Sequence, residues 1–289
     1  MKLLYTLTVL VIFIFLLGCG SGDQGQATFN FKQGYSGLQY KFFDNAPPQK
    51  IYPDSNFKII VELDNQAAYD AVDGSVQILG LDDKYFRLSS PSKQFFKKLA
   101  GKSLMAPKGE KEHVQFDFST TNALNEYGAE MYNANYFLKI AYNSNFDFAD
   151  TICLDPSLYD VYDSGCKAKD KISYSGQGSP VSVSLLETIL YPAGAGAQLE
   201  LRAKVKNAGK GKTSLITLEE AKLGGKEIKC VFKEELFGEN AAIIMKDKQE
   251  ANLVCETHIS GQKSYETTIL LRFSYDYEIK DKQILRMVK

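Results

Sequence analysis

Two stretches of the chain show the same alternation of apolar and polar residues. One covers residues 57–63 and ends at Asn65, and the other covers residues 199–205 and ends at Asn207. A period of two places every second side chain on one face, which is typical of a β-strand with one buried face. Asparagine suits the end of such a strand, because its side chain can bond its own backbone and tolerates a positive φ. The pattern predicts two equivalent strands, each followed by a turn.

A second pair of alternating stretches follows, at residues 136–142 and 269–275. The same order at a similar spacing suggests two copies of one fold. Further short strands are predicted between turns rich in Gly, Pro, Asn, Asp and Ser, and they cover residues 72–79, 114–118, 181–185, 213–218, 228–232 and 253–259. Residues 92–99 and 122–131 are predicted as short helices. Many short strands between such turns indicate an all-β chain built of antiparallel β-sandwiches.

A polar run rich in Gly and Ser, residues 173–180, separates the two predicted copies. Such a run is typical of a domain boundary. The sequence therefore predicts a first β-sandwich domain at residues 27–172, with longer loops, and a second at residues 173–289.

The stretch from Leu199 to Gly209 is an alternating strand closed by an Asn-Ala-Gly turn. It resembles the immunoglobulin-like modules of prokaryotic surface proteins, including the CARDB-like class related to cell adhesion. The first copy departs from the pattern, since Gln66-Ala67 stands in place of Ala-Gly. The resemblance implies two tandem immunoglobulin-like sandwiches with an adhesive or scaffolding role outside the cell, and it transfers no functional residue.

The chain begins with a short apolar leader. Lys2 precedes an apolar run at residues 3–17, which is too short to span a bilayer core of about 20 helical residues. The run ends in Leu16-Leu17-Gly18-Cys19, which resembles the lipobox of prokaryotic lipoproteins. That resemblance implies removal of residues 1–18 and a lipid on Cys19, with residues 19–26 as a flexible tether. A plain signal peptide and an uncleaved anchor are the alternatives, and both still export the chain.

Cysteine usage agrees with export. Besides Cys19 there are four cysteines, Cys153, Cys166, Cys230 and Cys255, and an even number favours disulfides in an oxidising compartment. Three pairings are possible, and sequence proximity favours Cys153–Cys166 and Cys230–Cys255. No Cys-x-x-Cys pair is present, so zinc is the weaker interpretation, and we predict no metal and no cofactor.

The net charge is −1, from 34 basic and 35 acidic residues, which argues against a nucleic-acid partner. The two histidines, His113 and His258, fall out of phase with their apolar neighbours and are expected at the surface. Residues 209–213 (Gly-Lys-Gly-Lys-Thr) resemble a phosphate loop only faintly and are interpreted as a hairpin turn. Residues 143–147 open like a calcium loop but lack the glycine and the glutamate of an EF-hand.

Two weaker binding hints remain. Asp155, Asp160 and Asp163 lie between the first two cysteines, where a surface calcium site competes with a solvated loop. Several tyrosines fall in predicted loops, where they either form a binding surface or fill a core that has no tryptophan. They are Tyr35, Tyr40, Tyr69, Tyr132, Tyr159, Tyr162 and Tyr174.

The sequence therefore predicts an extracytoplasmic lipoprotein, held to a membrane through Cys19, with a binding, adhesive or structural role and no catalytic activity. An envelope protein or a glycan is the expected partner. An accessory subunit of an envelope secretion, pilus or transport assembly is the alternative, and an extracytoplasmic hydrolase is the third.

Overall fold

The computed structural model describes residues 30–157, 165–194, 196–233, 240–243, 250–261 and 263–289. The leader, Cys19 and the whole predicted tether, residues 19–26, lie outside the described residues. Phe31–Lys289 forms one compact unit. Within the described part of the chain, no helix is long and apolar enough to cross a membrane.

The described chain is almost entirely β-structure, so the all-β prediction is confirmed. All strand pairs are antiparallel, and one helical turn is present, α2 (Ala123–Glu126). The first seven strands are β1 (Leu38–Phe42), β2 (Asn56–Asn65), β3 (Ala71–Leu79), β4 (Phe86–Leu88), β5 (Lys93–Leu99), β6 (Lys111–Thr120) and β7 (Met131–Leu154). The others are β8 (Lys171–Ser173), β9 (Val181–Ala193), β10 (Gly196–Asn207), β11 (Leu215–Leu223), β12 (Lys226–Glu227), β13 (Lys229–Phe232), β14 (Ala241–Ile243), β15 (Glu250–Ser260) and β16 (Tyr265–Val288).

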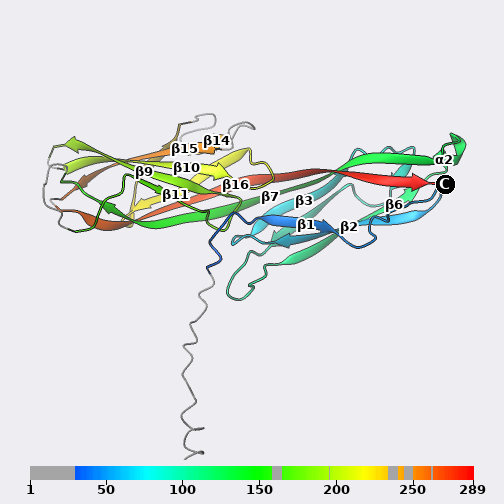
Figure 1. Ribbon diagram of the computed structural model, residues 1–289, viewed down its shortest axis with the longest axis horizontal. Helices are drawn as coiled ribbons and strands as arrows, with labels where there is room; N and C mark the ends of the chain where they lie inside the picture. Colours follow the sequence, from blue (N-terminus) through cyan, green and yellow to red (C-terminus); the bar gives the residue numbers. More distant parts are fainter. Residues whose placement is uncertain (1–29, 158–164, 195, 234–239, 244–249, 262) are drawn as a thin grey trace, which may run out of the picture. The chain divides into compact units, whose positions relative to one another are not determined.

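The strands form three sheets (Figure 1). A four-stranded sheet has the order β1-β2-β6-β4, and a five-stranded sheet has the order β13-β15-β10-β9-β8. The seven-stranded sheet has the order β12-β11-β16-β7-β3-β5, with β14 paired to β11. The alternating strands that the sequence singles out, β2 and β10, are inner strands of the two smaller sheets.

Two long strands, β7 and β16, form the centre of the seven-stranded sheet. They pair along their whole length, from Met131 opposite Val288 to Leu154 opposite Tyr265, and run side by side in Figure 1. They belong to different predicted domains, so hydrogen bonds join the two segments within one sheet. The division into two domains at residues 172/173 stays a prediction from the sequence.

Each smaller sheet packs on a different stretch of this long sheet. On one stretch, the Phe86 ring of β4 lies 6.4 Å from the Tyr132 ring of β7. On the other, the Phe232 ring of β13 lies 6.4 Å from the Phe273 ring of β16. Buried side chains from all three sheets form the core. This layered packing buries the apolar face that each alternating strand presents.

The helix predicted at residues 92–99 is wrong, since this segment is strand β5. It pairs with β3, with Phe95 opposite Ser75. Phe96 is buried and its ring covers Gly74, where an added Cβ would come within 1.9 Å of the ring. Pairing and this close packing override the helix-like spacing of apolar residues. The helix predicted at residues 122–131 is reduced to the single turn α2, and Met131 already belongs to β7.

Candidate functional site

The segment before β1 is held against the segment before β9. Gly34 bridges Gln177, and the Gly178 N–H donates to the Gly34 carbonyl at 2.8 Å. The Tyr35 hydroxyl donates to the carbonyl of Tyr174 at 3.3 Å. These bonds join residues far apart in the chain, and the Tyr35 ring remains 37% exposed.

Strand β1 carries a second tyrosine, Tyr40. Its hydroxyl donates to the Asp281 carboxylate of β16. The pKa of Tyr40 lies well above its usual value. Burial is the largest cause, and the hydrogen bond to Asp281 is the second. The hydroxyl therefore stays protonated at neutral pH and keeps the carboxylate oriented.

The loop between β10 and β11 completes the site, and Asn207 shapes it. The Asn207 Oδ1 accepts from the Gly209 N–H at 3.0 Å, and its Nδ2 donates to the Gly211 carbonyl at 3.0 Å. The hydroxyl of Tyr277 accepts from the Gly211 N–H at 2.9 Å. A Cβ on Gly209 would lie 2.0 Å from that hydroxyl, so the close approach requires glycine.

Asn65 makes the same local bonds in the first half of the chain. Its Oδ1 accepts from the Ala67 N–H at 3.1 Å, and its Nδ2 donates to the carbonyls of Tyr69 and Leu99, both at 2.9 Å. The two turns predicted from asparagine are therefore the same structure. The prediction of a hairpin turn at residues 209–213 is wrong. The strands on either side, β10 and β11, lie in different sheets and do not pair.

These three segments surround a hollow with a volume of about 560 Å³. Its lining includes β1 with the preceding residues and the middle of β16. The 208–211 loop and Pro180 form the end. The side chains that matter chemically are Tyr35, Tyr40, Lys210, Tyr277 and Asp281. Aromatic rings with hydroxyls, an ammonium and a carboxylate provide flat apolar contact and directed hydrogen bonds, which is how protein surfaces bind ligands non-covalently.

The structure separates the predicted tyrosines. Tyr35 and Tyr40 line the hollow, whereas the hydroxyl of Tyr69 meets the backbone of Asp147 and that of Tyr174 donates to Asp150 at 2.5 Å. The Tyr132 ring stacks on Tyr85 with 3.9 Å between the ring centroids. Tyr159 and Tyr162 lie outside the described residues. Sequence patterns did not mark Asp281 or Tyr277, because nothing local distinguishes them from other strand residues.

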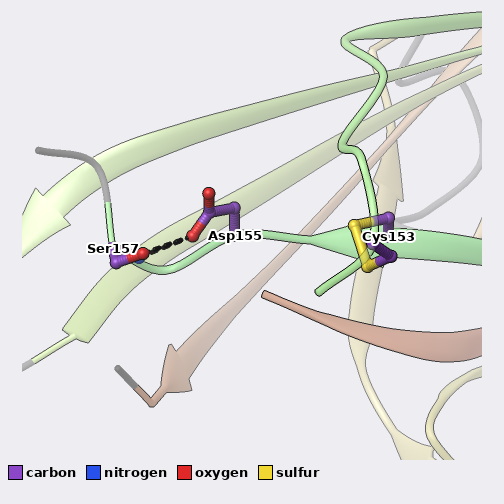
Figure 2. The surroundings of a disulfide bond; sticks show 4 residues. Cys153, Asp155 and Ser157 are labelled. Atoms are coloured by element: carbon purple, nitrogen blue, oxygen red, sulfur yellow. Dashed lines mark hydrogen bonds between the residues drawn. A yellow bond between two sulfur atoms is a disulfide. The ribbon is translucent and has the colours of Figure 1, made fainter. Parts of the chain in front are cut away.

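The disulfides are Cys153–Cys166 and Cys230–Cys255, the pairing that sequence proximity favours. Two disulfides suggest an oxidising, extracytoplasmic environment. Cys230 and Cys255 lie opposite each other on β13 and β15. Figure 2 shows the Cys153 bridge beside Asp155, whose carboxylate accepts from the Ser157 hydroxyl at 2.6 Å.

Asp160 and Asp163, the other carboxylates of the predicted calcium candidate, lie outside the described residues. Within the described part, no group of three His, Cys, Asp or Glu side chains is placed to hold a metal ion. Residues 143–147 belong to β7, and Asp147 pairs there with Arg272 at 3.0 Å and with Lys32 at 3.3 Å.

Both histidines lie at the surface, and neither lines the hollow. His258 Nε2 lies 3.3 Å from the Ala193 carbonyl. His113 Nε2 lies 3.2 Å from Glu62, which also pairs with Lys111 at 2.9 Å and Lys41 at 3.4 Å. The hydrogen bond from Lys111 is the main cause that lowers the pKa of Glu62. This carboxylate is therefore charged at neutral pH and neutralises its basic neighbours.

Comparison with known proteins adds no family. No family model matches the chain, and no curated protein matches it. Among solved structures, one similar chain is a protein of unknown function from Porphyromonas gingivalis W83, at 13% identity over 83% of each chain. The TM-score is 0.22, too low to support an inference about fold or function.

Proposed function

We propose that this protein is an extracytoplasmic lipoprotein, anchored through Cys19, that binds an envelope protein or a glycan at the cell surface without catalysing a reaction. The two disulfides support residence outside the cytoplasm. The leader that ends in Leu16-Leu17-Gly18-Cys19 supports the anchor.

The observation that carries the binding role is the hollow between β1 and β16. Its shape depends on bonds within the protein, because Tyr40 bonds Asp281 and Tyr277 bonds Gly211. A site that is already ordered loses little conformational entropy when a ligand arrives, so more of the contact energy appears as affinity. Rings such as Tyr35 and Tyr40 suit both sugar faces and peptide side chains.

We also propose that each half is an immunoglobulin-like sandwich. The orders β1-β2-β6-β4 and β9-β10-β15-β13 support equivalence, because the successive strands occupy similar places in the two sheets. In this proposal the last strand of each half continues into the other half. The second part of β7 serves as an added strand beside β16, and the second part of β16 serves beside β7.

Mass spectrometry of the protein from its native membrane tests the anchor. We expect an N-terminal Cys19 that carries acyl mass, and four cysteines without free thiols. An intact leader, or an unmodified N-terminus, would contradict the lipoprotein assignment.

Binding is tested with an unacylated chain, residues 19–289 carrying Cys19→Ser, against envelope glycan fragments and against detergent-solubilised envelope proteins. Tyr40→Ala and Lys210→Ala should each weaken binding about tenfold or more, because both side chains line the hollow. Tyr191→Ala and Lys226→Ala are matched controls outside it. Equal losses for both sets would rule out the hollow as the site.

One observation favours an accessory subunit as the second candidate. Glu278 exchanges backbone hydrogen bonds with Lys212, and the backbone of Ile51 bonds the Arg286 carbonyl and the Val288 N–H. In this part of β16, the backbone groups of even-numbered residues therefore point away from β7. By alternation, the backbone groups of Lys280 and Ile284 face outward too. No described strand pairs with them there, and an open edge can receive a strand from a partner.

Proline at position 284 distinguishes this candidate. Ile284→Pro removes an outward N–H and leaves the pairing with β7, whereas Ile284→Thr keeps the N–H. A stoichiometric envelope complex that survives in the threonine variant and is lost in the proline variant would support strand addition. A complex that is retained by both variants would exclude it.

A further inference from the structure

The outer face of the seven-stranded sheet carries a concentration of cations that the net charge of −1 conceals. Lys93 of β5, Gln77 of β3, Lys139 of β7 and Lys280 of β16 are successive cross-strand partners in one row. Neighbouring strands lie about 4.8 Å apart, so this row places the backbones of the three lysines within about 15 Å. We name this surface the basic face, and it includes Lys93, Phe95, Phe137, Lys139, Lys280, Lys282, Ile284 and Arg286.

Large apolar side chains protrude between these cations. Phe95 is 74% exposed and Ile284 is 64% exposed, although both lie on ordered strands. Lysines cover the aromatic rings, with the Lys93 ammonium 5.0 Å from the Phe95 centroid and the Lys280 ammonium 4.7 Å from the Phe137 centroid. The opposite face of the same strands is core, where Val76 and Ile140 are fully buried. Phe95 and Ile284 are therefore not part of the core and lie on the solvent-exposed face of the sheet.

Two of the cations on this face are direct neighbours across the sheet. Lys139 lies directly opposite Lys280, and like charges in a cross-strand pair repel. Glu278, two residues from Lys280 on β16, forms an ion pair with Lys139 at 2.7 Å and offsets part of this repulsion. An external anionic surface would relieve the repulsion that remains.

We propose that the basic face lies against the anionic phospholipid surface of the membrane that holds the anchor. This inference rests on the proposed function, since the anchor keeps the face near a bilayer. The thirteen residues from Cys19 to Phe31 span about 40 Å at full extension. Each basic side chain at the surface attracts anionic headgroups, and Phe95 and Ile284 enter the headgroup boundary. A polysaccharide offers the same charge but has no apolar layer for an isoleucine side chain.

Co-sedimentation with vesicles tests this proposal. The unacylated chain, residues 19–289 with Cys19→Ser, is mixed with vesicles of phosphatidylcholine with or without phosphatidylglycerol. We expect binding only when phosphatidylglycerol is present, and weaker binding in high salt. The double variant Lys280→Glu with Lys282→Glu should lose about tenfold or more in partitioning. Phe95→Ser with Ile284→Ser should remove the part of the binding that resists salt.

The matched control is Lys167→Glu with Lys169→Glu, which reverses two exposed cations off this face. It should bind phosphatidylglycerol vesicles about as well as the parent chain. Circular dichroism confirms that each variant folds, and Lys280→Gln with Lys282→Gln replaces the reversal if that variant does not.

Three outcomes would overturn the proposal: no binding to phosphatidylglycerol vesicles, equal losses in the basic-face and control variants, or binding to dextran sulfate in solution without binding to vesicles. The last would assign the face to an anionic polysaccharide. Because the assayed chain carries no lipid, each of these results leaves the acylation of Cys19, read by mass spectrometry, as a separate question.

Discussion

Tyr142 lies directly opposite Tyr277 at the midpoint of the paired strands β7 and β16. Their ring centroids are 5.5 Å apart, and both rings are buried. The Tyr277 hydroxyl also accepts a hydrogen bond from the Gly211 N–H. The tyrosine pair therefore connects the long sheet to the 208–211 loop, which lines one end of the hollow. The stability of the sheet and the shape of the hollow therefore depend on the same residue.

The contact between Gly209 and Tyr277 predicts a strong coupling. Gly209→Ala should cost about 2–3 kcal/mol in the free energy of unfolding, because its Cβ would lie 2.0 Å from the Tyr277 hydroxyl. Tyr277→Phe should cost about 1–2 kcal/mol, since the Gly211 N–H loses its acceptor. In the phenylalanine background the alanine should cost less, because the clashing oxygen is gone. Urea denaturation of the four proteins in a double-mutant cycle measures this coupling.

Tyr191→Phe is the control for that cycle, because its side chain is 45% exposed and it lies opposite Gln198, nine positions along β10 from Asn207. Additive effects of Gly209→Ala and Tyr277→Phe would show that the Tyr277 hydroxyl does not limit the space at position 209.

The two asparagine turns predict unequal losses. Asn65→Ala removes three hydrogen bonds of a buried side chain, and Asn207→Ala removes two. Each leaves buried backbone groups without partners, so we expect losses of about 3 and about 2 kcal/mol. Chemical denaturation measures both, with Asn125→Ala in the exposed turn α2 as the control. A larger loss at Asn207 would show that bond number does not decide the order.

Buried tyrosine predicts a loss of stability at alkaline pH. Burial raises the pKa of Tyr275 to about 12, while its hydroxyl shares a 2.8 Å hydrogen bond with Ser179. The unfolded tyrosine ionises near pH 10, so ionisation favours the unfolded state above that pH. The stability that Tyr275 contributes is complete below pH 10 and falls by about 2 kcal/mol as the pH reaches 12.

The measurement is the free energy of unfolding against pH for the parent chain and for Tyr275→Phe. The difference between the two should narrow between pH 10 and 12, because phenylalanine cannot ionise. Tyr127→Phe, at an exposed ring, should follow the parent curve. A constant difference across this range would show that Tyr275 does not titrate on unfolding.

The disulfides predict two separate losses on reduction. Cys153–Cys166 spans 13 residues and Cys230–Cys255 spans 25. Loop closure in the unfolded chain gives each bond about 3 kcal/mol, slightly more for the longer loop. Thermal unfolding of Cys153→Ser with Cys166→Ser, and of Cys230→Ser with Cys255→Ser, should show lower midpoints in both. An unchanged midpoint in either pair would mean that strain in the native bond cancels the entropy gain.

Local patterns in the sequence determined the alternating strands, the asparagine turns and the cysteine pairing. Alternation at residues 57–63 and 199–205 depends only on which side chains must leave water, so it could be recognised without the fold. The turns at Asn65 and Asn207 use bonds within four residues, and the cysteines of each pair are near in sequence. Such local features carry their own physical cause.

Tertiary structure decided what depends on partners distant in the chain. The pairing of β7 with β16 joins residues more than 100 positions apart, and alternation alone states no register. Strand β5 formed because β3 offered an edge and Gly74 left room for Phe96, which outweighed its helix-like spacing. The hollow and the basic face arise in the same way: side chains such as Tyr40 and Asp281, or Lys139 and Lys280, become neighbours only when the sheets have formed.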